Sequence, residues 1–284
     1  MDIRLGANQY GKAETRLVRV DRHEDRHEVT DLNVSTALAG DLAATHLTGD
    51  NAGVLPTDTQ KNTVYAFARD GISSIEAFAL RLARHFVDST ATIHRARVRI
   101  EQYSWERVAH HSFVRNSGTR TTTATYDGTA ATVVSGVDDL VVMNTTGSEF
   151  HGFHRDRYTT LAETDDRILA TAVRAEWRHA TADDTDWNAS HREASSHLVE
   201  AFADTHSLSL QQTLHAMGER VLRHRDELVE VRLSLPNKHH FLVDLSPFEL
   251  DNPGEVFFAA DRPYGLIEGT VVRDGAPDPG LAWW

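Results

Sequence analysis

The stretch Ser-Leu-Pro-Asn-Lys-His-His-Phe-Leu-Val-Asp-Leu, residues 234–245, joins two segments in which apolar and polar residues alternate. Before the proline, the apolar positions are Val229, Val231, Leu233 and Leu235. This period of two predicts a half-buried strand, and its continuation through residues 239–245 predicts a second one. Because Pro236 has no backbone N–H to donate, it breaks the pairing between the two strands.

The break leaves four polar side chains at the end of the predicted sheet: Asn237, Lys238, His239 and His240. A strand end on a fixed scaffold is a good place to hold a small ligand. The same pattern is also that of an ordinary hairpin with polar residues in its turn. The choice between these interpretations depends on the rest of the chain.

Composition narrows the classes of function. The chain has 284 residues, enough for one large or two ordinary domains. Its formal net charge of -13 argues against general nucleic-acid binding, although local groups can still bind a small anion. The absence of cysteine excludes disulfides, thiolate metal sites and cysteine nucleophiles. With a charged N-terminus and no long apolar run, the chain is expected to be a soluble, cytoplasmic protein.

The first half of the chain reads as strand–strand–helix–helix–strand–strand. Residues 12–20 and 32–38 alternate and predict a hairpin. Thr57 and Gln60 fit a capping box at the start of a helix that runs towards Gly71. A second helix is predicted by the apolar stripe Ile75, Phe78, Leu82 and Phe86. Residues 93–108 and 113–126 are rich in β-branched and aromatic side chains, which favour strands.

The second half repeats that order without repeating the sequence. Residues 133–145 and 168–177 are strand-like, and two helices follow, carrying Leu198 and Phe202 in one and Leu210, Leu214, Met217 and Val221 in the other. The 234–245 hairpin and a last strand at residues 267–272 complete the half, and the Pro- and Gly-rich tail from Asp274 is expected to be loose. The predicted fold is α+β, with two antiparallel sheets, each covered by a helix pair, in domains 1–136 and 137–284.

One short motif suggests a metal enzyme. His23-Glu24-Asp25-Arg26-His27 matches the pattern H-E-x-x-H of zinc peptidases, in which a helix places both histidines on one face. Here no apolar stripe surrounds it, and the flanking strands leave only a charged turn. The adjacent pairs 110–111 and 239–240 point to opposite faces of a strand and do not chelate one ion easily. A solvated hairpin loop is the preferred interpretation, and zinc peptidase remains a rival hypothesis.

Five motifs, in order along nearly the whole chain, together resemble the urate oxidase (uricase) family. They are Asn-Gln-Tyr-Gly-Lys at 8–12, Thr-Asp-Thr-Gln-Lys-Asn-Thr-Val-Tyr at 57–65, Thr-Gly-Ser-Glu-Phe-His-Gly-Phe at 146–153 with its continuation to Leu169, Ser-Leu-Gln-Gln-Thr at 209–213 and Ser-Leu-Pro-Asn-Lys-His at 234–239. Each motif alone is a weak signal, but their shared order makes the match specific.

The resemblance implies two tunnelling-fold (T-fold) domains in each chain, in agreement with the repeated order of elements. It also implies a homotetramer that encloses a tunnel, with active sites shared between neighbouring subunits. The implied reaction is the oxidation of urate by O2 to 5-hydroxyisourate and H2O2, with no metal and no organic cofactor. No nucleic acid or membrane is implied as a partner.

The resemblance also implies the residues that bind urate, a planar anionic purine. Arg167 would pair with one edge through its planar fork, and Gln211 would offer an amide donor and acceptor to the same edge. Phe150 would stack on the ring, and Leu210 would donate its backbone N–H. Thr57 and Asp58, at a helix start, would meet the opposite edge.

The resemblance further implies the catalytic groups. Asn237 would hold dioxygen, and later water, above the ring. Lys12, Thr57 and His239 would form a proton relay, in which the lysine accepts the proton through the threonine hydroxyl and the histidine assists from across the site. Without the family, Lys12 would read as a surface lysine, and Arg167 as a solvated ion pair of little energetic value.

Two departures and one further alternative accompany the resemblance. The sequence ends in Leu-Ala-Trp-Trp rather than the Ser-Lys-Leu type of peroxisomal signal, which favours a bacterial, cytoplasmic enzyme. His151 stands where a tryptophan is common in the family, which puts the stacking pocket beside it in question. A non-catalytic purine- or pterin-binding protein of the same fold is the alternative function, because fold does not determine function.

Overall fold

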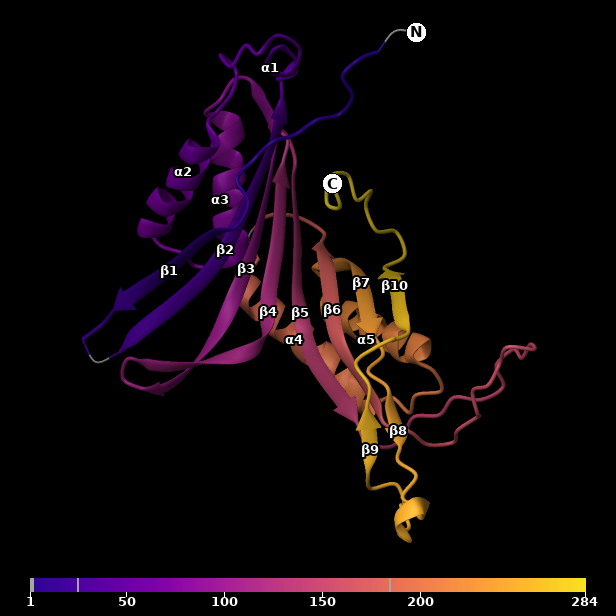
Figure 1. The fold of residues 1–284 in the computed structure, drawn as a ribbon. Helices are drawn as coiled ribbons and strands as arrows, with labels where there is room; N and C mark the ends of the chain where they lie inside the picture. Colours follow the sequence, from indigo (N-terminus) through magenta and orange to yellow (C-terminus); the bar gives the residue numbers. More distant parts are fainter. Residues whose placement is uncertain (1–2, 25, 184) are drawn as a thin grey trace.

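A single curved, antiparallel sheet organises the molecule (Figure 1). The computed structural model describes residues 3–24, 26–183 and 185–284. Eight strands pair in the order β1-β2-β3-β4-β5-β6-β7-β10. Their bounds are β1 Thr15–Arg22, β2 His27–Gly40, β3 Ile93–Ala109, β4 Ser112–Tyr126, β5 Ala131–Asn144, β6 Leu169–His179, β7 Leu228–Pro236 and β10 Leu266–Val272. Except at β7 and β10, neighbours in the sheet are neighbours in sequence.

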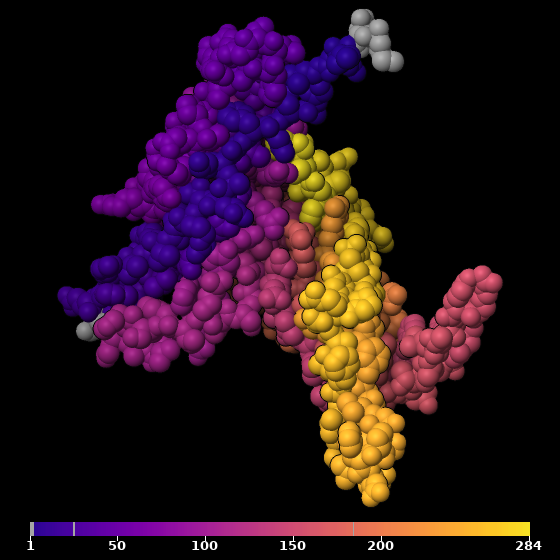
Figure 2. All heavy atoms as spheres, in the orientation of Figure 1, coloured from indigo at the N-terminus to yellow at the C-terminus, as the bar shows by residue number. Residues whose placement is uncertain are grey.

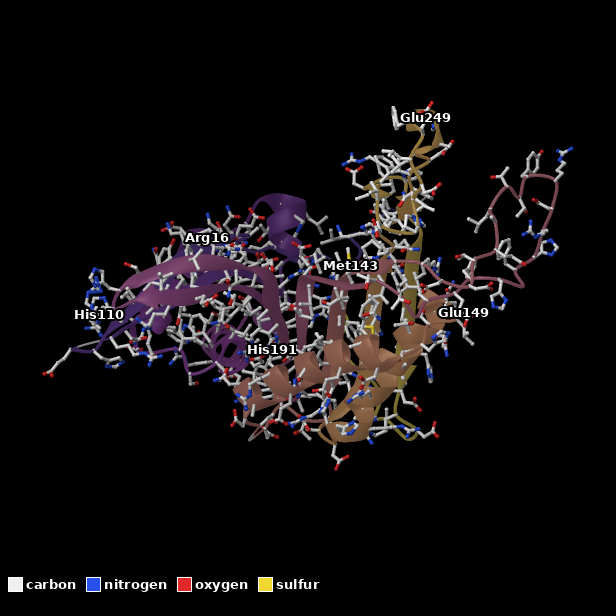
Figure 3. The ribbon with its side chains drawn as sticks, turned by 90° about the horizontal axis from the view of Figure 1, so that it is seen from below. Arg16, His110, Met143, Glu149, His191 and Glu249 are labelled. Carbon is white, nitrogen blue, oxygen red and sulfur yellow. The ribbon has the colours of Figure 1, made fainter. Side chains whose placement is uncertain are left out.

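Two helix pairs lie on one face of this sheet (Figures 1 and 3). The first pair is α2 (Thr57–Arg69) and α3 (Ile75–Asp88), and the second is α4 (Trp187–Asp204) and α5 (Leu210–His224). Each pair covers its own apolar cluster, one built around β2 and β3 and the other around β6 and β7. A short helix, α1 (Ala43–Thr48), follows β2 and was not predicted.

The predicted antiparallel pairing and the two covering helix pairs are confirmed, but the strands of both halves join in one continuous sheet rather than two. The hairpin of β1 and β2 pairs Thr15 with Val34 and Arg22 with His27. The predicted stripe Ile75, Phe78, Leu82 and Phe86 on α3 is buried, as is the stripe of α5. The sheet runs without interruption through β5, which contains Gly136. The division into domains 1–136 and 137–284 therefore stays a prediction.

The capping box predicted at Thr57 is wrong. Thr57 is the first residue of α2, and the N-cap is Pro56, which provides no side-chain cap. Gln60 is instead fully buried, and its Oε1 accepts a hydrogen bond of 2.6 Å from the hydroxyl of Thr36 on β2. The Gln60 side chain bonds to a strand instead of capping the helix. The local sequence around Gln60 does not reveal this distant partner.

The hairpin predicted around residues 234–245 is also wrong. The strand β7 pairs with β6 and β10, whereas the following strand β8 (His240–Leu242) pairs with β9 (Phe257–Ala259) in a separate sheet. Beyond Pro236, the backbone N–H groups of Asn237 and Lys238 donate to Gly265 and Ala170, each at 2.8 Å. The chain therefore continues straight on from the sheet instead of folding back. With the 3-10 helix Ser246–Phe248, β8 and β9 form an arm that projects from the body (Figures 1 and 2).

The tail beyond Asp274 is packed, contrary to expectation. Ala282 is only 3% exposed. The Trp283 ring lies under the guanidinium of Arg232, and the Trp284 ring under that of Arg95, at 3.6 Å in both contacts. Cation–π contacts with both halves of the sheet therefore hold the tail in place.

Candidate active site

A cavity of about 740 Å³ lies where β7 ends, beside the start of α5. It is bounded by the long loop between β5 and β6 and by the β8–β9 arm, the two projections in Figure 2. Six of the predicted site residues line it: Phe150, Arg167, Leu210, Gln211, Asn237 and His239. These residues come from four separate segments of the second half of the chain, and the fold brings them into one place.

Arg167 and Phe150 form one wall of the cavity. The Arg167 guanidinium carbon lies 5.2 Å from the centre of the Phe150 ring. Its Nε donates to the hydroxyl of Ser148 at 3.3 Å. Burial lowers the pKa of Arg167, but a guanidinium stays protonated at neutral pH. The wall therefore offers an aromatic face beside a partly desolvated cation.

Leu210 and Gln211 are the first two residues of α5. Ser209 is the N-cap, and its hydroxyl accepts the backbone N–H of Gln212 at 3.2 Å. The first N–H groups of a helix have no intrahelical acceptor, and they carry the positive end of the helix dipole. This helix start therefore offers backbone donors to an anion, with the Gln211 side chain as an additional amide.

Asn237 and His239 sit just beyond the end of β7. Asn237 pairs with Thr171 on β6 in an isolated bridge, which fixes its backbone. The His239 ring stacks on that of Phe241, with centroids 5.7 Å apart. Burial, and then the positive charges of Arg167 and His240, lower the pKa of His239. The imidazole is therefore neutral at pH 7 and able to accept a proton.

Lys12, Thr57 and Asp58 do not line this cavity. They belong to a separate cluster in the first half of the chain. The backbone N–H of Lys12 donates to the Thr36 hydroxyl at 3.2 Å, and the charge of Lys12, after that of the bonded Lys61, helps to lower the pKa of Asp58. We call Lys12, Thr57 and Asp58 the lysine–threonine cluster.

The first motif of the chain builds this cluster. Tyr10 pairs with Leu38 on β2, and its hydroxyl is 2.9 Å from both the carbonyl oxygen and the backbone nitrogen of Leu55, two residues before α2. Gly11 lies so close to β2 that a Cβ would stand 1.8 Å from the carbonyl oxygen of Thr36. Tyr10 thus joins the segment of Lys12 to the segment of Thr57. Sequence reasoning missed this role, although Tyr10 lies within a quoted motif.

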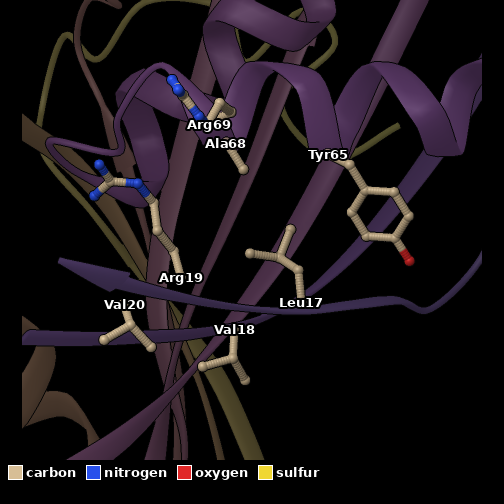
Figure 4. Close-up of a pocket in the computed structure, with 7 residues that line it drawn as sticks. All are labelled: Leu17, Val18, Arg19, Val20, Tyr65, Ala68 and Arg69. Atoms are coloured by element: carbon tan, nitrogen blue, oxygen red, sulfur yellow. The ribbon is translucent and has the colours of Figure 1, made fainter. Parts of the chain in front are cut away.

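A second hollow, of about 430 Å³, lies between β1 and α2 and contains none of the predicted residues (Figure 4). It is lined by Leu17, Val18, Arg19, Val20, Tyr65, Ala68 and Arg69. Its walls are a strand edge and a helix side, with two arginines at the rim (Figure 4). It has neither the amide groups nor the stacked aromatic wall of the larger cavity.

The H-E-x-x-H motif lies in the turn between β1 and β2, as predicted. The backbone N–H groups of His23 and Arg26 donate to each other's carbonyl oxygens at 3.1 and 3.2 Å, and His27 begins β2. Asp25 lies outside the described residues. Across the described ranges, no three His, Asp or Glu side chains are grouped to hold a metal ion, and no helix is long and apolar enough to cross a membrane.

Comparisons with known proteins agree on one family. The Uricase family model matches residues 8–131 and 133–268. A uricase of Arthrobacter globiformis is 54% identical, over 96% of this chain and 91% of that protein, and one of Dictyostelium discoideum is 38% identical, over 94% and 96%. The crystal structure of the Arthrobacter globiformis uricase superposes with a TM-score of 0.95 and 52% identity, over 99% of this chain and 100% of that one.

The antiparallel sheet and its two helix pairs, with the close structural match, place the chain in the tunnelling-fold class. Within that class, the chain belongs to the uricase family, and its activity is the oxidation of urate.

Proposed function

We propose that the 740 Å³ cavity binds urate, and that the chain oxidises it with O2 to 5-hydroxyisourate and H2O2 without a metal or organic cofactor. The observation that carries this proposal is the convergence of Phe150, Arg167, Gln211, Asn237 and His239 in that cavity. These residues come from four separate segments of the chain, so the meeting of those segments is a property of the fold.

Recognition uses the walls already described. Phe150 stacks on the purine ring, and Arg167 pairs with one edge through its planar fork. Gln211 and the backbone N–H of Leu210 complete that edge at the start of α5, where the helix dipole favours an anion. Removing any one of these donors leaves polar atoms of the buried purine unpaired, which lowers affinity.

The reaction balances without a cofactor if water supplies the new hydroxyl. Urate gives up two electrons and two protons in total, O2 takes both to become H2O2, and the oxygen added to the ring comes from water. Asn237, above the ring, would hold O2 first and water afterwards. The relay Lys12–Thr57 would accept a proton that urate gives up, and the neutral imidazole of His239 would assist this transfer.

The separation of the lysine–threonine cluster from the cavity supports a shared active site. The cluster belongs to the β1 end of the sheet, and the cavity to the β7 end, beside β10. We propose that Lys12, Thr57 and Asp58 of one subunit complete the cavity of its neighbour, within a homotetramer. A two-fold symmetric pair would then carry two equivalent sites.

A purine-binding protein without catalysis is the alternative at the level of the site. The presence of Lys12, Thr57, Asn237 and His239 favours the oxidase, because binding alone does not need a proton relay. The bacterial source of the 54% identical relative supports the proposed cytoplasmic location.

The deciding experiment follows the ultraviolet absorbance of urate in air, with protein treated with a strong chelator. Absorbance should fall and peroxide should form in equal amount, both with and without the chelator. A double variant, His23→Ala with His27→Ala, is expected to keep its activity, because both residues flank a solvated turn. Loss of activity on chelation and its return with zinc or copper would overturn the cofactor-free mechanism.

A further inference from the structure

A carboxylate held between two imidazoles lies directly behind the stacking wall. Glu149 precedes Phe150, and one of its oxygens accepts from His151 Nε2 at 2.6 Å. Its other oxygen accepts a hydrogen bond from His206 Nε2. His206 lies in the loop between α4 and α5, four residues before Leu210. We call Glu149, His151 and His206 the carboxylate clamp.

The clamp joins the two segments that carry the proposed purine-binding groups. Ser148 and Ser207 pair in a parallel bridge, in which Glu149 N–H donates to Ser207 O at 2.8 Å and Ser207 N–H donates to Gly147 O at 2.9 Å. Both serines are fully buried. The clamp adds a charged side-chain bond above this backbone pair, so the loop of Phe150 and the start of α5 are connected as one unit.

We propose that the carboxylate clamp is a positioning device, which holds Phe150 against the Leu210–Gln211 helix start and makes urate affinity depend on pH. This inference rests on the proposed urate site. Glu149 does not line the cavity, so it acts through its neighbours and not by contact with the substrate. Its side chain is 21% exposed, and those of His151 and His206 are 49% and 59% exposed, so solvent protons reach the clamp.

The protonation of the clamp follows from its contacts. The hydrogen bond to Glu149 raises the pKa of His151, and the two imidazoles lower the pKa of Glu149. The contribution of His151 is therefore complete below the ordinary histidine pKa and is lost as pH rises through its raised pKa. The contribution of Glu149 is complete above the ordinary carboxyl pKa and is lost as pH falls through its lowered pKa. The clamp is strongest between these limits.

Other charged groups face the clamp, and they do not reverse the direction of its pH dependence. Glu163 and Asp165, from the same loop, also raise the pKa of His151. Asp166 accepts from the Thr146 hydroxyl and from Gly147 N–H, each at 2.9 Å, and so secures the base of the loop. Arg167 is the nearby cation, and its Nε is bound to Ser148.

The test measures KM and kcat for urate between about pH 6 and pH 8.5 in three proteins. They are the wild-type chain, Glu149→Gln, and a matched control, His154→Gln, which changes an exposed histidine of the same loop. For the wild type, KM should rise as pH passes through the raised pKa of His151. Glu149→Gln should raise KM roughly three- to tenfold near pH 6.5, leave kcat within about twofold and flatten the pH dependence of KM. The control should match the wild type.

A second variant keeps the test decisive if Glu149→Gln folds poorly. Changing both His151 and His206 to glutamine keeps hydrogen-bond donors beside Glu149 but removes the His151 imidazole, whose pKa the bond to Glu149 raises. Its KM should be independent of pH and close to the high-pH value of the wild type. Unchanged KM and pH profile in Glu149→Gln, or in the double variant, would overturn the inference. A lower kcat and a lower free energy of unfolding in these variants, with KM unchanged, would also overturn the inference.

The same measurements separate failure of the clamp from failure of the site. Gln211→Leu removes a group that lines the cavity itself. If Gln211→Leu raises KM and Glu149→Gln does not, the site stands and the clamp is refuted. If neither variant changes KM, the purine binds elsewhere and the proposed site is refuted.

Discussion

Complementation between two inactive variants tests whether the active site is shared. Lys12→Met removes the proposed base from the lysine–threonine cluster, and His239→Ala removes its helper from the cavity. Each variant alone should retain below roughly 1% of wild-type turnover, because loss of a general acid–base group costs about 10²–10⁴-fold. Neither substitution touches the apolar clusters beneath the helix pairs, so both variants should fold.

The expected rescue follows from counting sites. If Lys12 comes from one subunit and His239 from its neighbour, a site is intact only when the first subunit is the His239→Ala chain and the second is the Lys12→Met chain. With equal amounts mixed at random, each condition holds about half of the time, so about one quarter of the sites are complete. Urate oxidation should therefore recover to about one quarter of the wild-type rate.

The assay co-expresses the two chains with different tags, purifies the mixed oligomers and follows the loss of urate absorbance. Mixing the two purified variants is the control, and it should restore little if the oligomers exchange subunits slowly. Mass spectrometry of the intact assembly establishes that mixed oligomers are present. With mixed oligomers present, a rate no higher than that of either variant would show that each site is built within one chain.

Three further predictions concern recognition, proton transfer and stability. Arg167→Lys keeps the charge but loses the planar fork beside Phe150. The binding free energy of a non-reactive purine analogue should therefore weaken by about 1.5–3 kcal/mol. An unchanged Kd by calorimetry would refute the pairing. The pKa of His239, measured by NMR, should lie below the ordinary value of 6.5. It should rise in Arg167→Gln, because that change removes a positive charge that disfavours the imidazolium. A pKa above 6.5 would contradict the neutral His239 imidazole of the proposed relay. Arg120→Met should lower the free energy of unfolding, measured with urea at fixed protein concentration, by about 3–5 kcal/mol. The reason is that Glu76 is 0% exposed and would lose its charged partner at 2.6 Å. The control is Arg84→Met, which loses an exposed ion pair at 3.9 Å and should change stability little.

The local spacing of apolar residues was enough to predict most of the helices and strands. The 3.6-residue stripe of α3 and the alternation in β1, β2 and β7 depend on which face of each element is buried, and a few consecutive residues record that face. The order of the elements was sufficient to predict antiparallel strands covered by two helix pairs, but not that the strands of both halves join in one sheet. The family resemblance named six residues that the structure brings together in one cavity, and their roles in binding stay a proposal.

Only the tertiary structure decided which segments meet. The strand after Pro236 pairs with β9 rather than β7, and Gln60 bonds to Thr36 rather than capping α2, because each finds its partner in a distant segment. The tail is ordered by the rings of Trp283 and Trp284 on arginines far away in sequence. The division of the proposed site into a cavity and a lysine–threonine cluster has the same origin. Periodicity records whether a residue faces the core, but the partner it meets there is set by the path of the whole chain.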